Sequence, residues 1–218
     1  MVSGRFITFE GGDGCGKTTQ SRRLLKTLET AGVPAVLTHE PGGTPGADAI
    51  RALLVQGDAA RWNPMSELLL HFAARADHVE RVIRPALEAG TWVICDRFVD
   101  STLAYQGYGQ GVEAKLLHQL HQLSIGGMEP ELTLVFDMDT ETALARARVR
   151  DNGKNRYEKM DVGFHRRLHE GFRKIARENP ERCVTIDASG TIDAVHEAVI
   201  TAVNTRLGTK IRLYSVSK

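Results

Sequence analysis

The chain of 218 residues has few cysteines and no long apolar run. Its three cysteines, Cys15, Cys95 and Cys183, are widely spaced and odd in number. This predicts free thiols in a reducing, cytoplasmic setting, without a disulfide framework or a cysteine metal site. No stretch of about 18 apolar residues occurs and no signal-peptide pattern precedes the first predicted strand, so we expect no membrane attachment. The net charge of +1 gives no reason to expect nucleic-acid binding.

What the sequence does contain is a phosphate-binding loop. Residues 11–18 fit the pattern G-x-x-x-x-G-K-[ST] at every fixed position. A strand is predicted before the loop, at 5–10, and a helix after it, at 19–31, which is the context such a loop requires. Its backbone N–H groups and the positive end of the helix would face phosphates. The residues predicted to bind the nucleoside triphosphate are Gly11, Gly12, Asp13, Gly14, Cys15, Gly16, Lys17, Thr18 and Thr19.

Several side chains have predicted roles in handling phosphate. Lys17 would reach the β- and γ-phosphates, and the Thr18 hydroxyl would be a ligand of Mg²⁺. Asp96 ends a predicted apolar strand and is the second predicted Mg²⁺ ligand, although an acid in that place can also cap the next helix. Arg97 follows directly, at the carboxyl ends of the strands, where open α/β sheets bind ligands.

Strand-like and helix-like segments alternate along the chain. The predicted strands are 5–10, 34–38, 91–96, 131–137 and 182–187, and the predicted helices are 19–31, 48–54, 64–83, 112–123, 140–149, 157–179 and 191–207. This alternation predicts one α/β domain over residues 1–218, with a five-stranded parallel sheet flanked by helices on both faces. Pro85 is expected to kink or restart the long helix before it. The tail at 208–218 is expected to be loosely held.

The loop alone indicates only a nucleoside triphosphate, and three uses of it need separating. A switch GTPase would carry N-K-x-D, which is absent, and the segment 123–128 matches a transport-ATPase signature poorly. A small phosphotransferase needs cations that close over the transferring phosphoryl group. Arg97 and the basic segment 146–156 supply such cations, and they predict a mobile basic lid at about 148–158. The alternative for that segment is a solvated charged face.

Five motifs in order carry a resemblance to a known family. They are Phe9-Glu10-Gly11 with Asp13, His39 to Thr44, Asp96-Arg97-Phe98, Tyr105-Gln106-Gly107, and Arg146-x-Arg148 leading to Arg156-Tyr157-Glu158. With them the chain resembles the bacterial thymidylate kinases over about residues 5–207. The resemblance implies a P-loop nucleoside monophosphate kinase-like fold, transfer of the γ-phosphoryl group of ATP to dTMP with Mg²⁺, and a homodimer.

The resemblance also implies roles for individual residues. Lys17, Asp13 and Arg97 would be catalytic, with Arg150 or Arg156 supplying the lid cation, because Gly14 leaves the loop without an arginine of its own. The residues implied in binding dTMP are Glu40, Pro41, Phe72, Arg75, Arg97, Thr102, Tyr105 and Gln106. Among them Phe72 would stack on thymine, Arg75 would hydrogen-bond it, and Tyr105 would favour deoxyribose.

Two positions depart from the family pattern. Many relatives carry arginine at the place of His39, and many place the stacking phenylalanine four residues before the arginine, where this chain has His71. One residue turns a helix by about 100°, so either His71 or Phe72 stacks on the base. A kinase for another nucleotide or deoxynucleoside remains an alternative, as does a protein that binds ATP without transferring phosphate.

Overall fold

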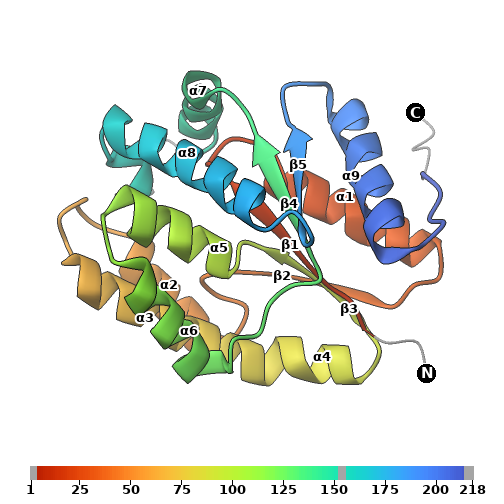
Figure 1. The fold of residues 1–218 in the computed structure, drawn as a ribbon, viewed down its shortest axis with the longest axis horizontal. Coiled ribbons are helices and arrows are strands. Elements are labelled where there is room, and N and C mark those ends of the chain that lie inside the picture. The colour runs from red at the N-terminus through yellow and green to blue at the C-terminus, as the bar shows by residue number, and fades with distance from the viewer. Residues whose placement is uncertain (1–3, 152–155, 214–218) are drawn as a thin grey trace.

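The computed structural model describes residues 4–151 and 156–213. At its centre lies a parallel sheet of five strands in the order β2-β3-β1-β4-β5 (Figure 1). The strands are β1 (Phe6–Gly11), β2 (Ala35–His39), β3 (Trp92–Asp96), β4 (Leu132–Asp137) and β5 (Cys183–Asp187). The predicted α/β class and five-stranded parallel sheet are confirmed, and each strand lies within two residues of its predicted bounds.

Strand β1 is central and is buried on both faces. It pairs with β3, with Phe9 opposite Asp96, and with β4, with Gly11 opposite Phe136. Successive side chains of a strand point to opposite faces, so Ile7 and Phe9 enter one core cluster while Phe6 enters another. All six residues of β1 are buried. The P-loop therefore directly follows a strand that is fully buried and paired on both sides.

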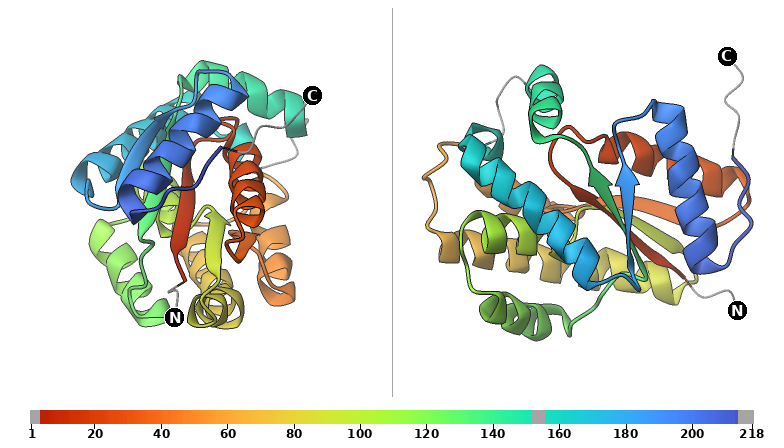
Figure 2. Two further views of the ribbon diagram at one scale, coloured as in Figure 1. Left: turned by 90° about the vertical axis from the view of Figure 1, so that its right-hand side faces the viewer. Right: turned by 45° about the horizontal axis from the view of Figure 1, so that its top comes forward.

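Two helices cover one face of the sheet. They are α1 (Lys17–Thr30) and α9 (Ile192–Leu207), which pack side by side (Figures 1 and 2). Their apolar side chains meet Ile7, Phe9 and Leu134 of the sheet in the largest core cluster. Thr191 caps α9, its hydroxyl accepting the Ala194 N–H at 3.2 Å. This layer fixes the direction of α1, whose amino end faces the P-loop.

The remaining helices lie on the other face of the sheet or beyond the carboxyl ends of its strands (Figure 1). They are α2 (Pro45–Val55), α3 (Pro64–His78) with the π-helical turn η1 (Val79–Ile83) and α4 (Arg84–Glu88), α5 (Val99–Thr102) with η2 (Leu103–Gly109), α6 (Ala114–Ile125), α7 (Thr140–Asp151), the 3₁₀ turn η3 (Arg156–Lys159) and α8 (Val162–Glu178). The break expected at Pro85 takes the form of the π-helical turn that directly precedes it. A proline lacks the N–H that would continue the α-helical ladder.

One predicted helix boundary and the expectation of a loosely held tail were wrong. The predicted helix 157–179 is a short 3₁₀ turn followed by α8, because Asp161 ends the turn and caps α8 by accepting the Phe164 N–H at 2.7 Å. The described part of the tail is also not loose. Asn204 accepts the Ile211 N–H at 2.8 Å and donates to the Ile211 carbonyl at 2.9 Å, and the Ile211 side chain joins the main core. Residues 214–218 and the centre of the predicted lid, 152–155, lie outside the described residues.

A buried ion pair joins the end of the sheet to the helices. Arg182 donates two hydrogen bonds to Asp100, at 2.7 and 2.9 Å, and one to Thr133 at 3.0 Å. Asp100 is fully buried, so its charge needs this bidentate partner.

In the described ranges, no helix combines the length and apolarity that crossing a bilayer would take.

Candidate functional site

The P-loop adopts the conformation that its glycines permit. Gly11, Gly14 and Gly16 all have positive φ, between 84° and 130°, which side chains other than glycine rarely tolerate. The Lys17 ammonium is buried and donates to the Gly11 and Gly12 carbonyls at 3.0 and 2.6 Å. Burial lowers the pKa of Lys17. The loop thus closes on itself around the one cation that it carries.

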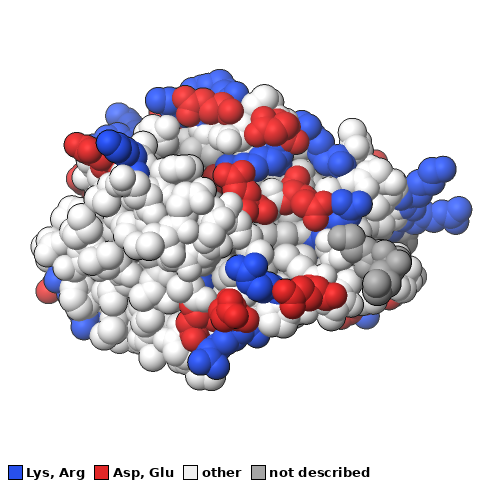
Figure 3. Space-filling view, turned by 60° about the horizontal axis from the view of Figure 1, so that its bottom comes forward, with Lys and Arg blue, Asp and Glu red and all other residues white. Residues whose placement is uncertain are grey.

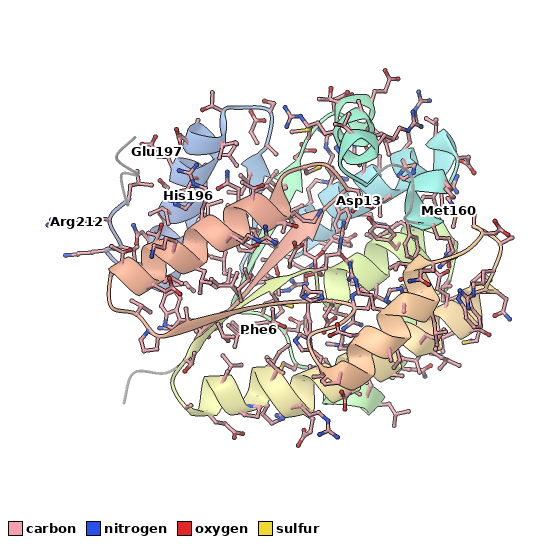
Figure 4. All side chains as sticks on the ribbon, turned by 180° about the vertical axis from the view of Figure 1, so that it is seen from behind. Phe6, Asp13, Met160, His196, Glu197 and Arg212 are labelled. Carbon is pink, nitrogen blue, oxygen red and sulfur yellow. The ribbon has the colours of Figure 1, made fainter. Side chains whose placement is uncertain are left out.

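Gly14 has no room for a side chain. A Cβ atom built there would lie 1.9 Å from the Ala143 carbonyl oxygen of α7. Figure 4 places Asp13, the neighbour of Gly14, just past the end of β1 and beside α7, with Phe6 marking the start of that strand. The loop therefore has no room for an arginine at this position, and Lys17 is its one cation.

The other loop residues divide by the direction of their side chains. Thr18 and Thr19 are exposed and line the cavity described below, and the Thr18 hydroxyl donates to Asp96 at 2.5 Å. The Cys15 side chain points into the main core instead, so only its backbone can serve the nucleotide. Burial raises the pKa of its thiol. The thiol therefore stays protonated and unreactive, and Cys15 acts as a small residue of the loop.

Arg97 connects the P-loop to the segment after β3. Its guanidinium donates to the Gly11 carbonyl at 2.9 Å, to Ser101 at 3.0 Å and to Asp13 at 2.7 Å. The ring of Tyr105 lies below it, 5.2 Å from its Cζ, and the Tyr105 hydroxyl contacts Asp13 at 3.3 Å. Burial opposes the charge, yet Tyr105 and the nearby acids raise the pKa of Arg97 above its ordinary value. Arg97 is a fixed cation.

A cavity of about 680 Å³ runs along the carboxyl ends of β1, β2 and β3. The P-loop lies at one end, and α3 with η2 lies at the other. Its lining includes most of the predicted site: Asp13, Gly14, Gly16, Lys17, Thr18, Thr19, Glu40, Pro41, Arg75, Asp96, Arg97, Thr102, Tyr105 and Gln106. Segments far apart in the sequence therefore form one site.

The far end of the cavity is built around Arg75. This residue is buried, and its guanidinium donates to Glu40 at 2.8 Å and to Thr102 at 2.9 Å. His78 holds the other Glu40 oxygen at 3.1 Å, so Glu40 orients Arg75. Within the described residues, neither the remaining nitrogen, Nη1, nor the Gln106 oxygen Oε1 has a hydrogen-bond partner. One buried, unpaired donor and one buried, unpaired acceptor thus belong to two residues that line the same end of the cavity.

The structure distinguishes between His71 and Phe72. His71 lines the cavity and its Nε2 bonds the Tyr157 hydroxyl at 2.9 Å. Phe72 is buried with Leu68 and Leu117, and its ring lies under Arg75, 5.1 Å from Cζ. Of the two candidates for stacking, His71 therefore lines the cavity and Phe72 does not, because one residue along α3 rotates Phe72 into the core. Burial, followed by the charge of Arg75, lowers the pKa of His71 to about 3.

Arg156 is placed differently from its predicted position. Its side chain is fully buried and donates to the Leu54 and Ala59 carbonyls at 2.9 Å and to Glu67. It does not line the cavity, so in this arrangement it cannot face a transferring phosphoryl group. Arg146 and Arg148 are exposed on α7. The side chain of Arg150, the other predicted lid cation, lies outside the described residues.

Sequence reasoning missed Arg51. It lines the cavity from α2 and donates to the Pro41 carbonyl at 2.7 Å. Burial and then the charge of Arg97 lower its pKa, which places the two arginines around the same space. A signal was present, since α2 begins directly after the glycine-rich loop His39–Thr44 and its first turns must face the cavity. His39 also lines the cavity, but its side chain is half exposed.

A P-loop joined by one cavity to a second, arginine-rich site defines a phosphotransferase of the nucleoside monophosphate kinase type. Comparison with known proteins gives the particular family. The thymidylate kinase family model matches residues 9–199. The chain is 52% identical to the thymidylate kinase of Caulobacter vibrioides over 95% of the chain and 100% of that protein, and 50% identical to that of Ruegeria pomeroyi over 94% and 97%.

A solved structure agrees with these relatives. The crystal structure of thymidylate kinase from Ehrlichia chaffeensis superposes with a TM-score of 0.73 at 40% identity, covering 92% of this chain and 99% of that one. The chain belongs to the thymidylate kinase family, and it has the family's fold.

The fit of Gly14 against α7 generates a first prediction. Gly14→Ala should lower the free energy of unfolding by about 2 kcal/mol or more, because the Cβ collides with Ala143 and φ is +84°. Urea unfolding measures this. Gly12→Ala is the matched control, since its Cβ would only contact Cys15 at 3.7 Å. Equal stability of the two variants would contradict the packing argument.

The environment of His71 generates a second prediction. Its folded pKa of about 3 lies below the unfolded value, so its contribution to stability is present above about pH 6.5 and is lost as the pH falls toward 3. Between pH 7.5 and 5.5, His71→Phe should lose about 1 kcal/mol less stability than the unsubstituted protein, after allowing for solvent in the cavity. Urea unfolding at the two pH values measures this, with the exposed His118→Gln as control. Parallel losses would contradict it.

Proposed function

We propose that this protein transfers the γ-phosphoryl group of ATP to dTMP, giving dTDP and ADP. The observation that carries the proposal is the single cavity that joins a P-loop to a base-sized site with one free donor and one free acceptor. Membership in the thymidylate kinase family supports the same reaction. Phosphoryl transfer depends mainly on positioning and charge neutralisation, and this cavity supplies both.

The free groups of Arg75 and Gln106 match the edge of thymine. Thymine offers the O4 acceptor beside the N3–H donor, whereas cytosine offers a donor amine beside an acceptor nitrogen. Arg75 Nη1 can donate to O4 and Gln106 Oε1 can accept from N3–H. Thr102, which accepts from Arg75, borders the same space. His71 lies where a ring can stack on the base, hydrogen-bonded to Tyr157.

The sugar and phosphate of dTMP extend from this base site toward the P-loop. Tyr105, whose hydroxyl contacts Asp13, stands beside the deoxyribose. Arg97 holds the acceptor phosphate, and Arg51 lies across the cavity from it. Lys17 exchanges its contacts with the loop carbonyls for the β- and γ-phosphates of ATP. These cations bring two anions together and neutralise the charge that develops on the transferring group.

The residues present fit Mg²⁺. Thr18 and Asp96 place two hard oxygen donors together, 2.5 Å apart, at the end of the P-loop, and Mg²⁺ prefers oxygen ligands with several retained waters. No cluster of three or more acidic, histidine or cysteine side chains suited to a metal occurs within residues 4–151 and 156–213, as expected for a site completed by phosphates. When bound with ATP, the ion would neutralise the β- and γ-phosphate oxygens.

The remaining expectations are part of the same proposal. The protein forms one domain with a basic lid at about residues 148–158, in which Arg150 is now the preferred cation because Arg156 is engaged elsewhere. The three buried, free thiols suit the cytoplasm, where dTMP and ATP are found. ATP and dTMP are the expected partners, without nucleic acid or membrane.

A homodimer is supported by one face of the molecule. Figure 3 displays a broad surface with few charged side chains on the side of α3 and α6. The exposed apolar side chains Met65 and Leu69 of α3 and Leu123 of α6 belong to these helices, and apolar exposure of this kind marks protein interfaces. Leu69→Glu should convert a dimer to a monomer by light scattering. A wild-type monomer at assay concentrations would contradict the proposal.

The reaction is tested by ADP release from Mg-ATP with dTMP, dUMP, dCMP, UMP, AMP and GMP as acceptors. We expect dTMP to lead, with dUMP next. A different leading nucleotide would leave the phosphate chemistry standing and overturn the base assignment. ATP binding without any acceptor turnover would overturn the kinase function.

Arg97 generates the matching mutational prediction. Arg97→Ala should lower kcat/KM for dTMP by about 10³ while the affinity for ATP changes little, because Arg97 holds the acceptor and the transition-state charge. Steady-state kinetics and ATP titration measure the two effects. Arg177→Ala is the control, since that side chain is exposed on α8 and does not line the cavity. An equal loss of ATP affinity would show that Arg97 maintains the P-loop instead.

A further inference from the structure

Donors from distant segments converge on one buried carboxylate, Glu67 of α3, and the Tyr157 hydroxyl is among them. This side chain is fully buried and does not line the cavity. Its Oε1 accepts from the Nε2 of Gln106 and from the Nε2 of Gln110, both at 2.7 Å. Its Oε2 accepts from Arg156. A carboxylate paired with a guanidinium only accepts hydrogen bonds, so every group around it must donate.

This arrangement determines which end of the Gln106 amide faces the cavity. An amide has a donating and an accepting end, and the network around it sets its orientation. Because Glu67 takes the nitrogen, the oxygen of Gln106 is left without a partner in the part of the chain that the structure describes. Gln106 lines the cavity and Gln110 does not. The buried acid therefore leaves the accepting end of this cavity-lining side chain unpaired, and a base that reaches Gln106 meets an acceptor.

We propose that Glu67 is a positioning residue for base selection: by fixing the Gln106 amide, it makes the site accept N3–H pyrimidines and reject cytosine. The inference rests on the proposed function and extends it to a residue that does not touch substrate. Cytosine would place its amine against Arg75 and its bare N3 against the Gln106 oxygen, two mismatched contacts. A buried polar group left unpaired weakens binding, because it has given up its hydrogen bonds to water without replacement.

Glu67→Gln tests this because it changes the hydrogen-bond pattern at nearly constant shape. Arg156 can only donate, so it takes the oxygen of the new amide. The new nitrogen then faces Gln106 and requires its oxygen, which turns the Gln106 amide over and presents N–H to the base. We expect the kcat/KM ratio of dTMP over dCMP to fall at least about tenfold, with the KM for ATP unchanged. If Glu67 had only a structural role, the substitution would lower kcat/KM for dTMP and for dCMP equally.

Two further variants keep the test decisive if Glu67→Gln folds poorly. Gln106→Met removes both ends of the amide while Glu67 keeps Gln110 and Arg156, and it should also lower the dTMP over dCMP ratio about tenfold. Gln110→Met is the matched control. It removes the other amide from the same Glu67 oxygen, outside the cavity, and should leave the ratio unchanged.

The outcomes separate the two proposals. A wild-type protein that does not phosphorylate dTMP overturns the proposed function itself. If the wild type prefers dTMP but folded Glu67→Gln and Gln106→Met both keep its ratio within about threefold, Glu67 does not select the base. If Gln110→Met lowers the ratio as much as Glu67→Gln, the effect is general loosening, which also overturns the inference.

Discussion

The position of Arg97 is the constraint on which the rest of the site depends. It is the one non-glycine residue with positive φ, 76°, among residues 4–151 and 156–213, a conformation that costs about 1–3 kcal/mol. Buried Glu10 offsets this cost by accepting the Phe98 N–H at 2.7 Å and the Ser101 hydroxyl at 2.6 Å. The turn directs the guanidinium back to the P-loop and is followed by α5 and η2. One strained residue thus fixes both halves of the cavity.

Pairing of an arginine with a carboxylate recurs in the interior of the protein. Four buried or partly buried arginines each contact their own carboxylate. The pairs are Arg75 with Glu40, Arg97 with Asp13, Arg156 with Glu67 and Arg182 with Asp100. Breaking such a pair is costly, because the remaining charge stays buried. Each pair joins segments distant in the sequence, so the fold orients the guanidinium groups before any ligand arrives. Binding sites ordered in advance lose less entropy on association.

The sequence predicted the sheet, the P-loop and most of the cavity because these depend on local patterns. An apolar strand, a glycine loop and a helix specify a phosphate site without reference to distant residues. The errors arose where tertiary contacts decide. Arg156 reads as a free lid cation until α2 and α3 are packed around it, and the choice between His71 and Phe72 depends on how α3 is rotated. Glu67 is also not recognisable from the sequence, since nothing nearby in the sequence reveals the distant side chains that donate to it.

The packing of Gly14 explains how the charges must be distributed over the site. A loop that touches α7 so closely cannot carry an arginine at Gly14, so under the proposed function neutralisation of the transferring group would divide between Lys17, Arg97 and a cation from outside the loop. Ala143 of α7, the residue that closes off Gly14, precedes the basic segment on the same helix. The contact between Gly14 and Ala143 therefore excludes an arginine from the loop and also positions the helix from which the basic segment continues. Substituting the loop alone cannot relocate the charge, because any side chain at Gly14 displaces the helix that carries the alternative.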